Sequence, residues 1–182
     1  MAVQIGAKPD SGFDDPIGML TDCHRRIEHF LGILCAVAER ARGRALMEEE
    51  SAAVQAALQY FRIGGQRHTA DEEESLFPRL RASAADDAAA ADDAGEIGAL
   101  ESDHQEANDL HALVETLFSG WIARSRLSDE EQSRLESMTR QLQRLYEEHI
   151  RVEEQVVFPR AASQLDRQTL AAIGEEFRAR RA

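Results

Sequence analysis

The sequence predicts an all-α protein, an antiparallel up-down-up-down four-helix bundle with a short fifth helix at its C-terminal end. Apolar side chains recur at alternating steps of three and four residues along four long segments, which is the stripe of a helix that packs against other helices. Helix formers are abundant and the 182 residues include only four prolines, so helix is favoured over sheet. We expect a flexible arm over residues 1–15, the bundle over residues 16–160, and the fifth helix within residues 161–182.

Start and stop signals delimit the two helices of the first half. Asp14-Asp15-Pro16 combines an acidic cap with a proline in the first turn, and this pattern begins a helix. We expect this helix to end at Gly43. The second helix is expected from about Glu48 to Phe77, where Pro78 stops it.

The second half repeats this plan after a low-complexity stretch. Residues 82–95 contain mainly alanine and aspartate and are expected to form a surface connection. The third helix is expected to start near Glu96. The fourth opens with the capping-box pattern of residues 128–131 and should close at Pro159. The short fifth helix is expected to follow Asp166.

The chain contains an internal repeat. RHTADEEESLFPR at residues 67–79 matches EHIRVEEQVVFPR at residues 148–160, as H-x3-E-E-x3-F-P-R. LTDCH at residues 20–24 matches LESDH at residues 100–104, as L-x3-H. Two helical hairpins of the same plan are therefore expected to make the bundle.

Six polar residues interrupt the apolar stripes and are the candidate metal ligands. At ~1.5 Å of rise per residue, all four histidines lie ~12–14 Å from the same end of the bundle, in one layer. Each glutamate follows a histidine by four residues and so shares its helix face. Burying these groups together is costly unless a cation compensates, which favours metal binding over a merely hydrogen-bonded polar layer. The six residues are His24, His68, Glu72, His104, His149 and Glu153.

With its two Phe-Pro pairs, this pattern resembles the hemerythrin-like HHE cation-binding domain family over roughly residues 16–160. The resemblance implies an oxo- or hydroxo-bridged di-iron site, with Glu72 and Glu153 as bridging carboxylates and the four histidines as terminal ligands. Imidazole and carboxylate donors suit a pair of iron ions, although zinc or manganese fits the same ligands. Roles of the family include dioxygen binding, nitric oxide or peroxide chemistry, and iron or oxygen sensing.

The chain departs from the oxygen-carrying hemerythrins at two places. Those carriers have a second histidine where this chain has Asn108, and their last motif is H-x4-D where this chain has H-x3-E. Fewer imidazoles leave more of the coordination sphere to an exogenous ligand. We therefore expect a non-haem di-iron protein that reacts with dioxygen, peroxide or nitric oxide in redox or nitrosative stress defence, using an unknown reductant. The alternatives are a sensor module without turnover, iron storage or delivery, and a structural bundle without metal.

Several residues near the six are candidates for an outer shell or an access route. Glu28 follows His24 by four residues and is interpreted as a surface glutamate rather than an extra ligand. His111 lies two turns beyond His104, too far for the same metal centre. Gly65 precedes His68 by about one turn, and either leaves room for Tyr146 or a channel, or marks a close backbone crossing.

Three further side chains receive ordinary interpretations. Glu73 and Glu154 lie about 100° round the helix from the ligands, so they are expected on solvated faces. Cys23 is expected to be a small buried thiol, with redox activity as the alternative.

Charge and composition limit the partners. The formal net charge of −13 argues against nucleic acid and against an anionic membrane surface, because both are polyanions. Residues 1–15 lack the apolar core of a signal peptide, and the longest apolar run, residues 31–38, is too short to span a bilayer. We expect a cytoplasmic protein.

Overall fold

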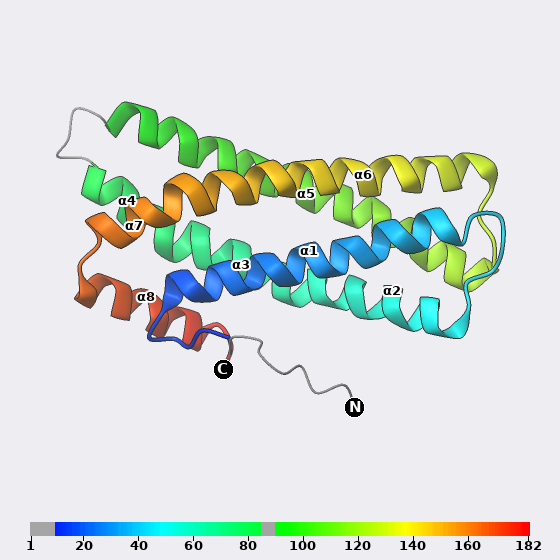
Figure 1. Cartoon of the computed structure of the whole chain (residues 1–182), viewed down its shortest axis with the longest axis horizontal. Helices are drawn as coiled ribbons and strands as arrows, with labels where there is room; N and C mark the ends of the chain where they lie inside the picture. The colour runs from blue at the N-terminus through cyan, green and yellow to red at the C-terminus, as the bar shows by residue number, and fades with distance from the viewer. Residues whose placement is uncertain (1–9, 85–89) are drawn as a thin grey trace.

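The computed structural model describes residues 10–84 and 90–182, and these residues fold into helices joined by short connections (Figure 1). Three short π-helical segments, named η1 to η3, interrupt the longer rods. In chain order the elements are α1 (Pro16–Arg40), α2 (Glu48–Tyr60), η1 (Phe61–Gly65), α3 (Gln66–Asp71), η2 (Glu72–Leu76), α4 (Phe77–Ala84), α5 (Ala90–Arg124), α6 (Asp129–Val152), η3 (Glu153–Val157), α7 (Phe158–Gln164) and α8 (Arg167–Ala179).

Four rods form the bundle. The first is α1, the second runs from α2 through α4, the third is α5, and the fourth runs from α6 through α7 (Figure 1). Consecutive rods run in opposite directions. The first rod packs against the second and the fourth, and α5 packs against the same two. The predicted all-α, up-down-up-down fold class is therefore confirmed, with α8 as the short C-terminal helix.

Side-chain caps fix three of the predicted helix starts. The Asp15 carboxylate accepts a hydrogen bond from the backbone N–H of Gly18 over 3.0 Å at the start of α1. Ser128 and Glu131 form a reciprocal capping box in front of α6. Asp166 accepts from the backbone N–H of Thr169 over 2.8 Å and begins α8. Each bond satisfies a backbone donor that has no partner within the helix.

The expected helix ends at Pro78 and Pro159 are wrong. Both prolines lie inside rods that continue, to Ala84 and to Gln164. A π-helical segment precedes each proline, and in each case the next residue, Phe77 or Phe158, donates its N–H to the carbonyl five residues back. A proline ring clashes with the carbonyl four residues back in a regular α-helix, and the wider π turn relieves this clash.

The third rod begins earlier than expected. α5 starts at Ala90 instead of near Glu96. Of the surface connection predicted over residues 82–95, residues 82–84 and 90–95 are helical, and residues 85–89 lie outside the described part of the chain.

Residues 10–15 pack against the bundle, in contrast to the loose arm expected over residues 1–15, of which residues 1–9 lie outside the described part. The backbone N–H of Ser11 donates to Asp22 over 2.6 Å, and the Arg178 guanidinium lies 5.0 Å from the centre of the Phe13 ring. α8 is fastened in turn by Arg181, whose guanidinium lies 2.5 Å from the buried Asp71 carboxylate of α3. These contacts close the end of the bundle at which α1 begins (Figure 1).

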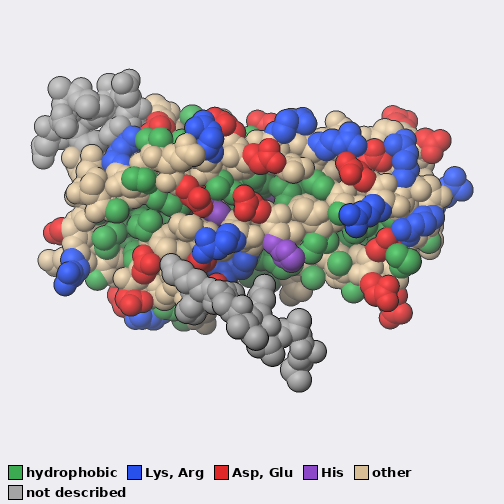
Figure 2. All heavy atoms as spheres, viewed as in Figure 1, with side chains coloured by type: hydrophobic (Ala, Val, Ile, Leu, Met, Phe, Trp, Pro, Cys, Tyr) green, Lys and Arg blue, Asp and Glu red, His purple; other side chains and the backbone are tan. Residues whose placement is uncertain are grey.

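Two apolar clusters fill the interior, and the metal-ligand candidates lie between them. The larger cluster contains Ile27 with Val114 and Leu142. The smaller one contains Leu20 with Phe77 and joins the bundle to α8. Outside this core, acidic and basic side chains alternate over the face shown in Figure 2. Within residues 10–84 and 90–182, no helix combines the length and hydropathy that a membrane crossing requires.

The contact between α8 and residues 10–15 gives a test of this closed end. A methyl group at Gly174 would overlap the Phe13 carbonyl oxygen, whereas one at Gly32 on α1 would meet nothing within 4 Å. We expect Gly174→Ala to lower the free energy of unfolding by about 1–3 kcal/mol through overpacking. The matched control Gly32→Ala should raise it by about 0.5–1 kcal/mol, because alanine is the better helix former. Urea denaturation measures both, and equal stabilities of the two variants would contradict the packing described.

Candidate metal centre

The six predicted ligands come together in one buried layer. They extend from all four rods into the space between the two apolar clusters. His104 is the most exposed of them, at 9 %, and both glutamates are 0 % exposed. The layer combines His24 of α1, His68 of α3, Glu72 of η2, His104 of α5, His149 of α6 and Glu153 of η3.

The six side chains form two groups that could each hold a cation. One group is His24 and His68 with the two glutamates, and the other is His104 and His149 with the same two glutamates. Within each group the candidate ligand atoms lie within 4.8 Å of one another. Both carboxylates therefore belong to both groups.

The glutamates lie between the two pairs of imidazoles. Glu153 directs one oxygen to His24 Nε2, 3.0 Å away, and the other to His149 Nε2, 3.3 Å away. Glu72 Oε2 lies 3.5 Å from His68 Nε2 and 3.4 Å from His104 Nε2. Each carboxylate thus contacts one histidine of each group, as a bridge between two ions requires.

Unsatisfied polar atoms show that this donor set suits a cation. Among the described residues, each of the six has at least one buried nitrogen or oxygen atom without a hydrogen-bond partner, and both glutamates have two. Such atoms are rare in folded proteins because each loses its hydration without compensation. A metal ion bound between them would supply the missing interactions, and nitrogen and oxygen donors of this kind bind divalent and trivalent metals.

The buried carboxyl groups differ in protonation. Burial raises the pKa of Glu72 well above its usual range, and the nearby Glu153 carboxylate raises it further. Burial also opposes the ionisation of Glu153, but the adjacent imidazoles of His149 and His24, 3.3 and 3.0 Å away, outweigh it and hold the pKa of Glu153 well below the usual range. Burial lowers the pKa of His68 well below its ordinary value, which keeps this imidazole neutral. A cation would therefore displace the Glu72 proton and meet a neutral His68.

Three outer carboxylates orient three of the imidazoles. His24 Nδ1 donates to Glu154 and His104 Nδ1 donates to Glu73, each over 2.9 Å. His149 Nδ1 donates to Asp103 over 3.3 Å. A proton held on Nδ1 leaves the Nε2 lone pair free for a metal.

Glu154 lies on the solvated face expected for it, and Glu73 is half-buried. The expectation missed that each side chain also reaches the histidine of an adjacent rod. Both follow a ligand glutamate directly, at matching places of the internal repeat, and this symmetry was the sequence signal for their role. The repeat gave no such signal for Asp103, because the corresponding residue of the first half is Cys23 and not an acidic residue.

His68 is the exception among the four histidines. Its Nδ1 is buried without a hydrogen-bond partner in the described chain. The repeat places Cys23 where the corresponding histidine, His149, has Asp103. The Cys23 thiol is buried and lies 3.5 Å from an Arg26 nitrogen. Burial raises the pKa of this thiol, which is the behaviour of the buried thiol expected from the sequence.

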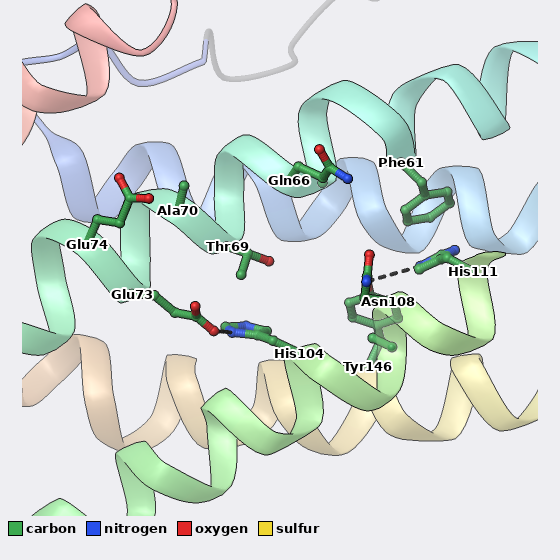
Figure 3. A pocket seen from close by; sticks show the side chains of 12 residues that line it. Phe61, Gln66, Thr69, Ala70, Glu73, Glu74, His104, Asn108, His111 and Tyr146 are labelled. Atoms are coloured by element: carbon green, nitrogen blue, oxygen red, sulfur yellow. Dashed lines mark hydrogen bonds and ion pairs between the residues drawn. The ribbon is translucent and has the colours of Figure 1, made fainter.

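A cavity of about 220 Å³ reaches the layer from the surface between α3 and α5 (Figure 3). His104 and Ala107 are buried in its wall, and Gln66 and Asn108 are exposed at its edge. Because a water molecule occupies about 30 Å³ of liquid volume, the cavity admits a molecule of a few atoms.

The predicted access residues line this cavity. Gly65, Asn108, His111 and Tyr146 all contribute to its wall (Figure 3). A Cβ atom at Gly65 would meet only the Phe61 ring, at an ordinary 3.6 Å, so the alternative of a close backbone crossing at this glycine is wrong. Glu28 is exposed, in a separate hollow beside Tyr146.

The fold and the buried histidine and glutamate groups define a helical bundle of the metal-binding class. The sequence matches the model of the hemerythrin HHE cation-binding domain over residues 15–161. The chain belongs to this family. A search among curated proteins gave no match.

The outer carboxylates give a test of the site. Replacing Glu73 or Glu154 by glutamine removes the charge that holds the Nδ1 proton of a ligand candidate, and we expect a loss of about 10- to 100-fold in metal affinity. Glu148→Gln is the matched control, since Glu148 is exposed and pairs, within residues 10–84 and 90–182, with Arg151 alone. Competition with a chromophoric chelator measures the affinities. Equal affinities in all three variants would contradict the orienting role.

Proposed function

We propose that the chain is a non-haem di-iron protein that binds and reacts with dioxygen, peroxide or nitric oxide in redox or nitrosative stress defence. The observation that supports this proposal most strongly is the sharing of both Glu72 and Glu153 by two four-ligand groups. Two cations held side by side need carboxylates that reach both. A single site would use only one of the two groups.

The donor set favours iron. Four imidazoles and two carboxylates offer nitrogen and oxygen atoms without thiolate, a mixture that suits iron better than the sulfur-rich sites of structural zinc. Manganese or zinc remains an alternative that metal analysis decides. Bound iron supplies electrons to a small ligand and accepts them from it.

The protein supplies geometry, exclusion of bulk water and an access route. His24, His104 and His149 are fixed by their outer carboxylates, so their Nε2 atoms are aligned before a metal or ligand arrives. The apolar clusters on both sides keep the layer dry. The cavity beside His104 gives one open side at which a small ligand can enter.

The six residues of the layer are histidines and glutamates, whose side chains do not donate electrons. Repeated turnover therefore needs a reductant from outside the chain. A cytoplasmic location, where small reductants are plentiful and thiols stay reduced, remains our expectation. The two free thiols, Cys23 and Cys35, are compatible with it.

Peroxide consumption by the iron-loaded protein in the presence of ascorbate tests the function. We expect many peroxide molecules to be reduced per chain, and a slower reaction in Gly65→Leu because the leucine side chain narrows the cavity. Gly98→Leu is the matched control, since a Cβ at Gly98 meets nothing within 4 Å. Parallel assays with dioxygen and nitric oxide identify the preferred ligand. A protein that loads two irons and turns over none of the three would contradict the proposal.

A further inference from the structure

A line of aromatic side chains connects the metal layer with the surface of α1. It crosses all four rods and contains both tyrosines of the chain. Successive ring centres lie 4.1 to 5.8 Å apart. From the inside outward the rings belong to Tyr146, His111, Phe61, Tyr60, Phe30 and the exposed His29.

The inner end of this line is a tyrosine bonded to a base. The Tyr146 hydroxyl lies 3.1 Å from His111 Nε2 (Figure 3). Burial lowers the pKa of His111 to about 4, so the imidazole is neutral at pH 7 and Nε2 can accept the phenol proton. Burial raises the pKa of Tyr146, with smaller contributions from Tyr60 and the two ligand glutamates. The phenol is therefore protonated and donates the hydrogen bond.

This pair lies beside the candidate metal layer. Tyr146 precedes His149 by three residues, so the two side chains share one face of α6 about one turn apart. Tyr146 also lines the same cavity as His104. The aromatic ring is thus part of the wall of the cavity through which a small molecule would reach the layer.

We propose that Tyr146 is a one-electron donor to the metal layer and that His111 takes its proton. The proposal rests on the proposed function, with hydrogen peroxide as the oxidant. When one electron leaves the Tyr146 ring for the layer, the phenolic O–H bond breaks and the proton moves to Nε2 of His111, which is within reach of proton transfer. A neutral tyrosyl radical and an imidazolium result.

The cycle closes when an electron from a one-electron reductant such as ascorbate reaches Tyr146. The proton then returns from His111, and the pair is restored. Two such cycles supply the two electrons that, with two protons from solvent, convert one hydrogen peroxide into two water molecules. The rings from Phe61 to Phe30 provide contact between Tyr146 and the surface at which the reductant arrives.

The second tyrosine gives a built-in control. The Tyr60 hydroxyl donates to the backbone carbonyl of Cys23 over 3.3 Å, and a carbonyl oxygen does not take up a proton at neutral pH. Tyr60 is therefore harder to oxidise than Tyr146, although both are half-buried and in the same line.

Electron paramagnetic resonance of freeze-quenched samples tests the proposal. Iron-loaded protein mixed with hydrogen peroxide, without ascorbate, should show a tyrosyl radical in the wild type and in Tyr60→Phe. The signal should be lost in Tyr146→Phe and reduced several-fold in His111→Phe. The optical spectrum of each variant verifies that iron is bound. A radical that persists in Tyr146→Phe and disappears in Tyr60→Phe would overturn the proposal.

A second measurement separates this proposal from the function on which it rests. The metal-free full-length protein is oxidised by a photogenerated ruthenium(III) complex, and the radical yields of the two phenylalanine variants are compared. One outcome would be peroxide turnover without a Tyr146 radical, together with equal photochemical radical yields in Tyr146→Phe and Tyr60→Phe. It would overturn electron donation by Tyr146 and leave the proposed function intact. Selective photo-oxidation of Tyr146 in a protein whose iron-loaded form consumes neither peroxide nor dioxygen nor nitric oxide would support the redox-active pair and refute the function.

Discussion

The central constraint on this bundle is the burial of six ionisable side chains in one layer, and the packing of the rods around them keeps that layer buried. Two carboxylates at 0 % exposure face four imidazoles, and part of every one of these groups lacks a hydrogen bond within the described chain. Such a layer is strongly unfavourable in an apolar interior unless opposite charge compensates it. The apolar clusters on either side hold the rods together against this cost. A bound cation compensates these groups, and because it binds the folded state it raises the free energy of unfolding.

The internal repeat explains how the layer is built. Each half contributes one histidine from its first rod and a histidine-glutamate pair from its second, and each ligand glutamate begins a π-helical segment that leads into Phe-Pro. The phenylalanines stack on ligand candidates, Phe158 on His24 and Phe77 on His104, with ring centres 5.3 and 6.3 Å apart. The two halves differ on the cavity side, where Gly65 and Tyr146 occupy corresponding positions of the repeat. They also differ around His68, whose Nδ1 has no partner among the described residues and for which the repeat has Cys23 in place of an aspartate. The route to the metal layer and the hydrogen bonds to the ligand histidines therefore differ between the two halves of the repeat.

Much of this architecture follows from the sequence, and the misses have physical causes. The apolar stripes and caps predicted the four rods and α8, and helical rise placed His24, His68, His104 and His149 at one depth. The stops at Pro78 and Pro159 failed because local proline rules do not anticipate a π turn that accommodates the ring. A regular helical wheel puts Glu73 and Glu154 at the partly solvated edge of their rods, but it cannot show that their side chains reach His104 and His24 on adjacent rods. Contacts that join distant segments, such as residues 10–15 with α8, have no periodic signal in the sequence.

The central claim is that two cations bind between the glutamates, and anomalous diffraction from crystals of the iron-loaded protein tests it most directly. Two anomalous peaks per chain are expected, one beside His24 and His68 and one beside His104 and His149, with Glu72 and Glu153 between them. Data on both sides of the iron absorption edge would identify the metal at each peak. A single peak, peaks elsewhere on the acidic surface, or no peak in a well-folded protein would contradict the account.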